Sequence, residues 1–114
     1  MSDEVKALAV GEEETRGGEG TTDIVVPARN HRQRVDLIAY HNGFGGGGST
    51  AGLLLSMDGT RLGNPEDRNF ENYYLELRRT VILERDKSAS FRAAFTNSGA
   101  TTTIRGLIAT IRHV

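Results

Sequence analysis

The residues with the clearest chemical potential form a glycine-rich stretch, "HNGFGGGGSTAG", at residues 41–52. Gly43, Gly45 and Gly48 match the dinucleotide-binding pattern G-x-G-x-x-G, and residues 43–50 nearly match the phosphate-binding pattern G-x-x-x-x-G-K-[ST]. In such a loop, glycines let backbone N–H groups approach phosphates while a helix begins just beyond. An apolar run, "RVDLIAY", precedes the stretch, as a phosphate loop requires.

Two parts of a phosphate loop are missing from this stretch. Ser49 stands where a lysine should follow Gly48, and "TAGLLLSM" is too short for a full amphipathic helix before Asp58–Gly59 ends it. A crossover unit also needs a second parallel strand, whereas the residues that follow are typical of an antiparallel meander. We therefore predict no nucleotide binding and interpret residues 43–48 as a long mobile hairpin loop, opened by Asn42–Gly43.

The other residues that could do chemistry form no recognisable set. His31, His41 and His113 lack the spacing of metal ligands, so we interpret them as surface or edge histidines. The serines lie in no nucleophile motif. The chain has no cysteine, which excludes disulfides, thiolate metal sites and a cysteine nucleophile. The sequence therefore predicts a protein that is not an enzyme and that takes no cofactor or metal.

Charge and hydropathy bear on the possible partners. The segment "PARNHRQR" gathers three arginines that could meet phosphates. It has no interleaved aromatic residues for base stacking, and the net charge of the chain is −1, so nucleic acid is disfavoured. An apolar run long enough to span a membrane and a signal peptide are both absent, so we predict neither a membrane partner nor secretion.

Apolar residues alternate with polar ones from Asp23 onward, which is the pattern of strands. The alternation is sustained over residues 34–40, 73–83 and 88–96, and in the last of these Phe91 and Phe95 share the buried face. Periodicity alone leaves residues 49–57 open between strand and helix, but the Asp58–Gly59 hairpin signal favours strand. We predict one antiparallel β-sandwich domain, jelly-roll-like and of about six to eight strands, over residues 23–114.

Acidic residues are concentrated before this domain. Residues 1–23 hold seven acids and two bases, a balance of −5, whereas the remainder holds eight acids and twelve bases, a balance of +4. "VKALAV" allows a turn or two of helix, and "GEEETRGGEGTT" has no apolar side chain to bury, so we predict a flexible acidic arm over residues 1–22. The arm is either a solvated tail or a segment that lies on a neighbouring surface.

A candidate interface follows from this arrangement. The segment "DIVV" could add as a strand to a partner sheet, and the nearby arginines could meet acids of a neighbouring copy. The residues of this candidate interface are Asp23, Ile24, Val25, Val26, Arg29, Arg32 and Arg34.

The final segment, "NYYLELRRTVILERDKSASFRAAFTNSGATTTIRGLIATIRHV", has a strand, a polar turn, an alternating strand, an Asn-Ser-Gly turn and a last strand interrupted by glycine. This style of sequence resembles the C-terminal half of small β-sandwich accessory proteins in tailed-bacteriophage virions, such as capsid decoration or cement proteins. Asp86 departs from that pattern, since glycine is expected at its turn. No functional residue carries over.

The resemblance implies a structural virion protein, assembled in the host cytoplasm, whose partners are other copies of itself and a major capsid or tail protein. The alternative is a small ligand-binding or carbohydrate-binding β-module. Sugar sites usually present aromatic platforms, but Tyr73 and Tyr74 are adjacent on one strand and therefore point to opposite faces.

Overall fold

Strands and no helix make up the regular structure of the computed structural model, which describes residues 7–63, 65–68 and 72–114. The strand pairs are antiparallel and belong to one sheet, so the all-β antiparallel prediction is confirmed. In chain order the described strands are β1 (Glu13–Glu19), β2 (Asp23–Val26), β3 (Gln33–Met57), β4 (Thr60–Arg61), β5 (Glu66–Arg68), β6 (Asn72–Leu83) and β7 (Ala89–His113).

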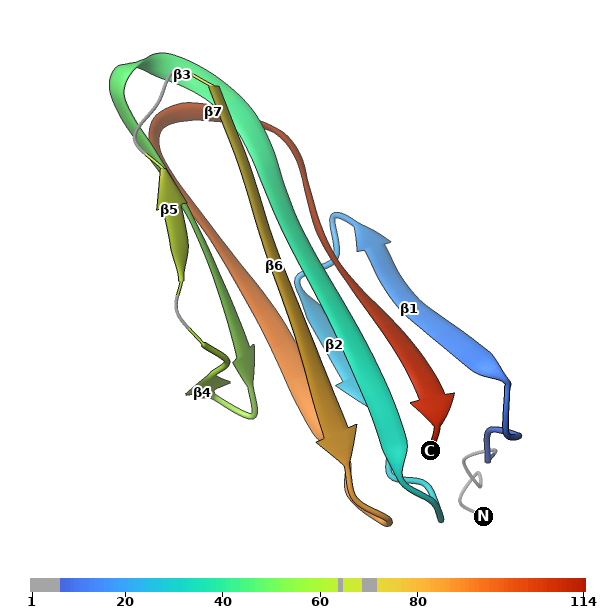
Figure 1. The fold of residues 1–114 in the computed structure, drawn as a ribbon. Coiled ribbons are helices and arrows are strands. Elements are labelled where there is room, and N and C mark those ends of the chain that lie inside the picture. The colour runs from blue at the N-terminus through green and yellow to red at the C-terminus, as the bar shows by residue number, and fades with distance from the viewer. Residues whose placement is uncertain (1–6, 64, 69–71) are drawn as a thin grey trace, which may run out of the picture.

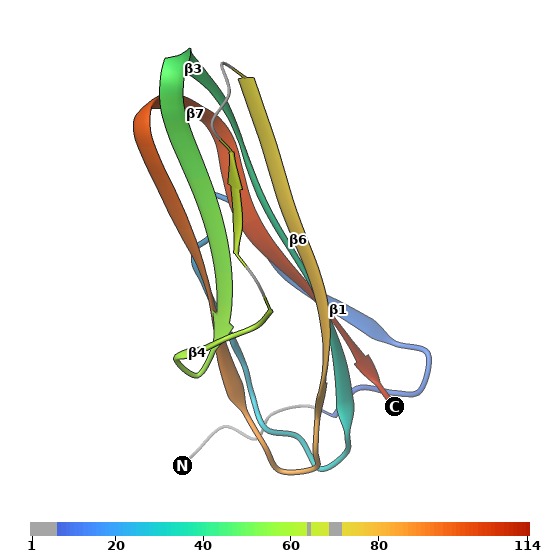
Figure 2. The same cartoon turned by 60° about the vertical axis from the view of Figure 1, so that its left-hand side comes forward.

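Two strands of 25 residues each, β3 and β7, organise the whole sheet. They pair along their full lengths, from Gln33 opposite His113 to Met57 opposite Phe91. Both strands bend over together at one end of the molecule (Figure 1), which folds the single sheet into two layers (Figure 2). The first layer contains β1, the second half of β7, the first half of β3 and β6; the second contains β2, the first half of β7, the second half of β3, β4 and β5.

The glycine-rich stretch lies at this bend, and its interpretation as a hairpin loop is wrong. Gly45 is opposite Ala100 and Thr50 is opposite Ser98, so residues 46–49 of β3 face the single residue Gly99 of β7. A hairpin would pair the segments on either side of the stretch with each other, but both pair with β7. The expected Asn-Ser-Gly turn at residues 97–99 is likewise a bend inside β7, where Gly99 has a φ of 75°.

The core lies between the two layers and follows the predicted alternation. Val35, Leu37 and Ala39 are buried on one face of β3, and Phe91 is 1% exposed. Phe95 is only partly buried at the rim of this cluster. The other large side chains that are fully buried include Leu53, Leu55, Leu75, Leu107 and Ile111.

Two aspartates adopt left-handed backbone conformations at the turns. Asp58 and Gly59 have φ angles of 49° and 82°, so both central residues of the β3–β4 hairpin have the positive φ of a type I′ turn. This confirms the hairpin that Asp58–Gly59 predicted. Asp86 has a φ of 64° in the β6–β7 turn, which explains why glycine is expected there and why aspartate is tolerated.

The predicted flexible arm is corrected for the part that the structure describes. Residues 13–19 are not a linker but strand β1, which pairs with β7 from Glu13 opposite Arg112 to Glu19 opposite Gly106. No helix occurs in residues 7–10, and Leu8 is 6% exposed. The rest of the expected helix, residues 1–6, lies outside the described residues.

The physical reason for β1 is that strand pairing needs backbone groups and a free edge rather than apolar side chains. The edge of β7 supplies the backbone partner of β1. The acidic side chains of β1, which were expected to be solvated, pair with arginines of the same chain. Glu13 accepts a hydrogen bond from Arg112 Nη2 at 2.8 Å, and Glu14 accepts one from Arg29 Nη2 at 2.5 Å.

Candidate protein interface

The strand that was expected to join a partner pairs within the chain. β2 runs antiparallel to β7, with Ile24 and Val26 buried and Val25 57% exposed. Asp23 is exposed and forms an ion pair with Arg92 Nε at 2.8 Å. Ile24 and Val26 therefore belong to the core and do not reach a partner.

The outer edge of β2 is open but partly capped. Thr22 O accepts a hydrogen bond from Ala93 N–H at 2.9 Å, and hydrogen-bonded pairs alternate along antiparallel strands. The backbone groups of Asp23 and Val25 consequently point away from β7. Arg16 Nη1 of β1 donates to Val25 O at 3.0 Å and so covers one of these groups.

The three arginines of the predicted interface have separate environments. Arg29 is 5% exposed and donates to Gln33 Oε1 and Glu14 Oε2, both at 2.5 Å. Burial, the largest influence, acts to raise the pKa of Glu14, but hydrogen bonds and charges from Arg16 and Arg29 lower it overall. Arg29 is therefore part of a structural ion pair inside the molecule.

Arg32 and Arg34 are exposed but are engaged with carboxylates of their own chain. Arg32 Nε lies 2.9 Å from Glu84 Oε1, and Arg34 Nε lies 3.2 Å from an oxygen of Asp36. The structure thus does not bring the seven predicted residues together on one surface.

A different surface gathers exposed apolar side chains: the outer face of the first layer. Register places Tyr74 of β6 and Ile104 of β7 on either side of Asn42 of β3, and strand alternation turns Phe44 to the same side. Tyr74 is 59%, Phe44 51% and Ile104 36% exposed. With their partly buried neighbours, the members of this apolar face are Ile38, Tyr40, Phe44, Tyr74, Ile104 and Ile108.

An unsatisfied polar atom lies at the centre of the apolar face. Within the described part of the chain, Asn42 Oδ1 is buried and has no hydrogen-bond donor. Buried amide oxygens almost always have a partner in folded proteins. Because this oxygen is fully buried, a donor of a bound partner reaches it only after a local rearrangement of the face.

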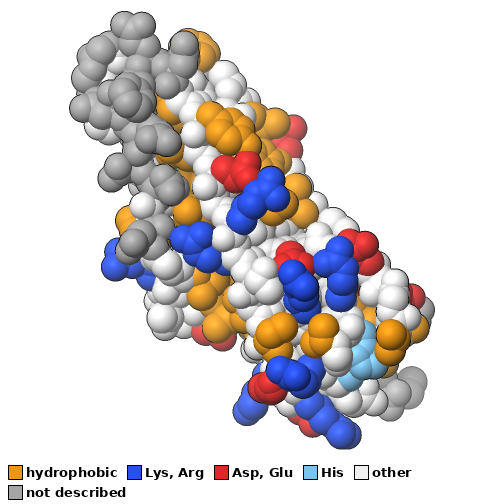
Figure 3. Space-filling model, in the orientation of Figure 1, with side chains coloured by type: hydrophobic (Ala, Val, Ile, Leu, Met, Phe, Trp, Pro, Cys, Tyr) orange, Lys and Arg blue, Asp and Glu red, His pale blue; other side chains and the backbone are white. Residues whose placement is uncertain are grey.

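Charged side chains follow the apolar face toward the far end of the same layer, and Figure 3 shows blue and red groups interspersed with orange ones over the middle and lower part of the molecule. Asp36 accepts hydrogen bonds from Thr80 Oγ1 at 2.6 Å, Arg112 Nη1 at 2.9 Å and Arg34 Nε at 3.2 Å. Burial, the largest influence, acts to raise the pKa of Asp36, but these hydrogen bonds and the two guanidinium charges lower it overall. Asp36 is consequently ionised at neutral pH and links Thr80, Arg112 and Arg34 on the outer face.

The sequence contained one signal of this surface. Ile38 and Tyr40 make the second face of residues 34–40 half apolar, and this pattern indicated a central strand. β3 is indeed central, between β6 and β7. Its second face nevertheless points outward, and only the register shows that Tyr74 and Ile104 extend it.

His41 is not the surface or edge histidine that the sequence suggested, because its side chain is fully buried beside the bend. Its Nδ1 lies 3.1 Å from Gly52 O, so it must carry the proton, and Nε2 accepts from Thr102 Oγ1 at 2.9 Å and Tyr73 OH at 3.2 Å. Burial is the main cause of the lowered pKa of His41. Through its bond to Gly52 O, the neutral ring links the first half of β3 to the second half, which lies in the other layer.

The lowered pKa makes stability depend on pH. Below about pH 6.5 the unfolded chain binds a proton at His41 more readily than the folded protein does, so the free energy of unfolding should fall as pH falls, by at most about 1.4 kcal/mol per pH unit. Urea unfolding at pH 7.5 and 5.5, set by buffer, measures this loss. We expect a smaller loss for His41→Gln, because the variant lacks the titrating ring while His31 and His113 remain in both proteins. An equal loss in both proteins would contradict this role of His41.

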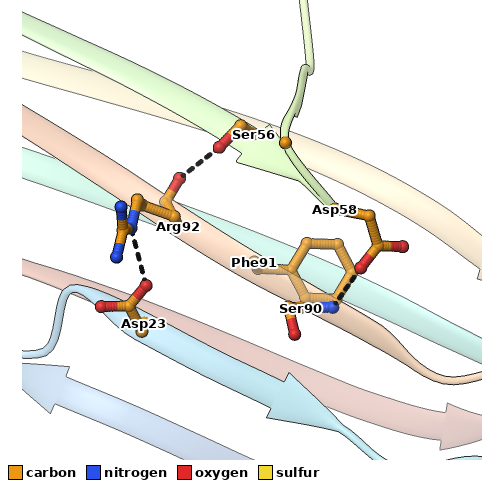
Figure 4. Close-up of a pocket in the computed structure, with 7 residues that line it drawn as sticks. Asp23, Ser56, Asp58, Ser90, Phe91 and Arg92 are labelled. Atoms are coloured by element: carbon orange, nitrogen blue, oxygen red, sulfur yellow. Dashed lines mark hydrogen bonds and ion pairs between the residues drawn. The ribbon is translucent and has the colours of Figure 1, made fainter.

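A shallow hollow of about 400 Å³ lies on the second layer between β2, β7 and the β3–β4 hairpin (Figure 4). Its polar groups bond to one another or to the backbone: Asp23 to Arg92, and Asp58 Oδ1 to Ser90 N–H at 2.8 Å. Ser56 donates only to the carbonyl of Arg92, at 3.5 Å. The hollow therefore presents no nucleophile activated by a base.

The described residues contain no group of three or more His, Cys, Asp or Glu residues placed to hold a metal ion. No helix among them is long and apolar enough to cross a membrane.

Comparisons with known proteins bear on the fold alone. No protein-family model matches the chain, and no curated protein matches it either. Among solved structures, it is similar to dimeric latent PorU from Porphyromonas gingivalis, with a TM-score of 0.53 and 14% sequence identity. The similarity covers 98% of this chain but only 14% of that one. The chain thus shares an all-β fold with a small part of a much longer protein.

Proposed function

We propose that this protein is a structural module that binds other proteins through its apolar face, without catalysis, as an accessory component of a bacteriophage virion. The observation that carries the binding proposal is the cluster of exposed Phe44, Tyr74 and Ile104 around the unsatisfied oxygen of Asn42. Aromatic side chains on a rigid sheet are favoured at protein interfaces because they bury large areas at low entropic cost. The virion context rests on the resemblance of residues 72–114, which form β6 and β7.

The partner in this proposal is a major capsid or tail protein. Its surface would supply apolar groups that cover Phe44, Tyr74 and Ile104. The neighbouring charges of Arg34, Asp36 and Arg112 would form the polar rim of such an interface.

Binding to particles tests this proposal. We expect the chain to band with virions of its source in a density gradient, and a Phe44→Ser/Tyr74→Ser variant to rebind stripped particles at least tenfold more weakly, because interface anchors contribute about 2 kcal/mol or more each. Val25→Ser is the matched control, since Val25 is equally exposed on the other layer. Particles without the chain would contradict the virion context, and unchanged rebinding would contradict the role of the face.

A carbohydrate-binding module is the second candidate, and the aromatic groups of the face favour it. Tyr73 and Tyr74 point to opposite sides as expected, but Tyr40, Phe44 and Tyr74 share the outer face. An array of soluble glycans tests this candidate. Glycan binding that Tyr74→Ser abolishes would support this alternative and count against the protein-binding proposal.

A further inference from the structure

β6 is the longest strand of the described sheet that is paired along one side only. β6 pairs with β3 along one side, and within the described residues no strand pairs with its other side. It is 12 residues long, whereas natural edge strands are usually short or protected because an open edge invites pairing. The open edge of β6 is therefore a candidate site for pairing with another strand.

The backbone groups at this edge can be assigned from the ladder. Val114 N–H donates to Arg32 O, so the even-numbered residues of β3 direct their backbone groups toward β7 and the odd-numbered ones toward β6. The odd-numbered residues of β3 lie opposite odd-numbered residues of β6. The free edge consequently presents the N–H and C=O groups of Tyr74, Glu76, Arg78, Thr80 and Ile82.

One side-chain contact agrees with this assignment. Arg79 Nη1 donates to Arg78 O at 2.8 Å, so that carbonyl is not used by β3. The same guanidinium donates through Nε to Leu62 O at 3.2 Å. Arg79 covers one acceptor of the edge and leaves the assigned N–H groups facing outward.

We propose that β6 pairs edge to edge with β6 of a second copy of this chain, antiparallel, with Leu77 of each copy opposite Leu77 of the other. This arrangement places Glu76 opposite the second copy's Arg78, and Arg78 opposite the second copy's Glu76. Two opposite-charge pairs form at the centre of the dimer, related by its two-fold axis. The first layers of the two copies then form one continuous sheet.

Charge disfavours the two neighbouring two-fold registers, and only an axis at residue 77 places opposite charges of β6 opposite each other. A two-fold axis at residue 78 would place Arg78 opposite the second copy's Arg78, and an axis at residue 76 would place two glutamates opposite each other. Like charges directly opposite one another are destabilising on a sheet. In the single copy, Glu76 accepts hydrogen bonds from Tyr74 OH and Arg78 Nε of its own strand. On dimerisation, Glu76 and Arg78 can each replace this partner by the oppositely charged residue of the second copy.

Edge pairing is independent of the virion proposal, because it uses backbone groups at the side of the sheet rather than the apolar face. Different measurements therefore test the two proposals. Particle binding by the Phe44 and Tyr74 variant tests the apolar face, whereas the mass of the isolated protein tests the edge.

Charge reversal tests the proposal by sedimentation at a concentration of about 100 µM, set high because edge pairing buries little surface. We expect the wild-type chain to sediment with the mass of two chains. Glu76→Arg and Arg78→Glu should each sediment as single chains, since each places like charges opposite. An equimolar mixture of the two variants should form dimers again, because each supplies the charge that the other needs.

The doubly substituted Glu76→Arg/Arg78→Glu chain should also dimerise by itself, as the pairs are merely exchanged. Glu13→Arg is the matched control, because Glu13 is an exposed acid at the opposite edge of the same layer and should leave the dimer intact. Thr80→Pro removes an outward N–H and no backbone hydrogen bond to β3, although the bond from Thr80 Oγ1 to Asp36 is lost, and it should weaken the dimer.

Three results would overturn the proposal. One is a wild-type chain that sediments as a single copy at this concentration. Another is a dimer that survives both charge reversals, with circular dichroism showing that the variants are folded. The third is a mixture of the two folded variants that stays monomeric.

Discussion

Phe91→Ala is expected to lower the free energy of unfolding by about 3–5 kcal/mol, a large part of the stability of a domain of this size. Phe91 is 1% exposed and lies on β7 between Ile24 of β2 and Met57 of β3. Removing its ring leaves a cavity where two layers meet, and flanking strands on both sides limit how far the site can collapse. Urea unfolding followed by circular dichroism measures the loss.

Val25→Ala provides the control for this prediction, because Val25 is 57% exposed on the neighbouring strand and its truncation should change stability by about 0.5 kcal/mol or less. A loss below about 1 kcal/mol for Phe91→Ala would show that the ring does not pack in the core.

Gly43→Ala is the second substitution with a large expected effect, and it addresses the glycine-rich stretch. A Cβ atom at Gly43 would lie 2.2 Å from Thr101 O and 2.3 Å from Tyr73 OH. The first of these atoms belongs to the paired backbone of β7 and the second to the buried network around His41, so neither can move freely. We expect a loss of about 2–3 kcal/mol, as for overpacked cores.

Gly46→Ala offers a matched control three residues after Gly43 in the same stretch. A Cβ atom there meets nothing within 4 Å, so the substitution should be neutral or stabilise by a few tenths of a kcal/mol. Gly45→Ala should be harmful, because its Cβ would lie 2.5 Å from Ser49 Oγ, which donates to Gly99 O across the bend. Equal melting temperatures for Gly43→Ala and Gly46→Ala would show that the stretch is a mobile loop after all.

The contacts at Gly43 and Gly45 bear on the interpretation of residues 43–48 as a mobile hairpin loop. A mobile loop would tolerate alanine at Gly45 as readily as at Gly46. In the bend, whether a position must be glycine depends on how closely atoms of other segments, such as β7 and Tyr73, approach its backbone.

The sequence by itself determined that residues 34–40, 73–83 and 89–96 are strands, and which way their side chains point. Val35, Leu37 and Ala39 are buried, as is Phe91, because a strand alternates its side chains by covalent geometry, whatever its partner is. Asp58–Gly59 formed the predicted hairpin for a similar reason, since two positive φ angles are a local preference.

Only the tertiary structure decided which segments are partners. Residues 13–19 became β1 because β7 offered them an edge far away in sequence, as in the pairing of Glu13 with Arg112, which are 99 residues apart. The same long-range pairing turned the glycine stretch into a bend and buried His41 and Arg29. Alternation is a property of one strand, whereas register and burial depend on contacts between distant segments, and no local pattern specifies those contacts.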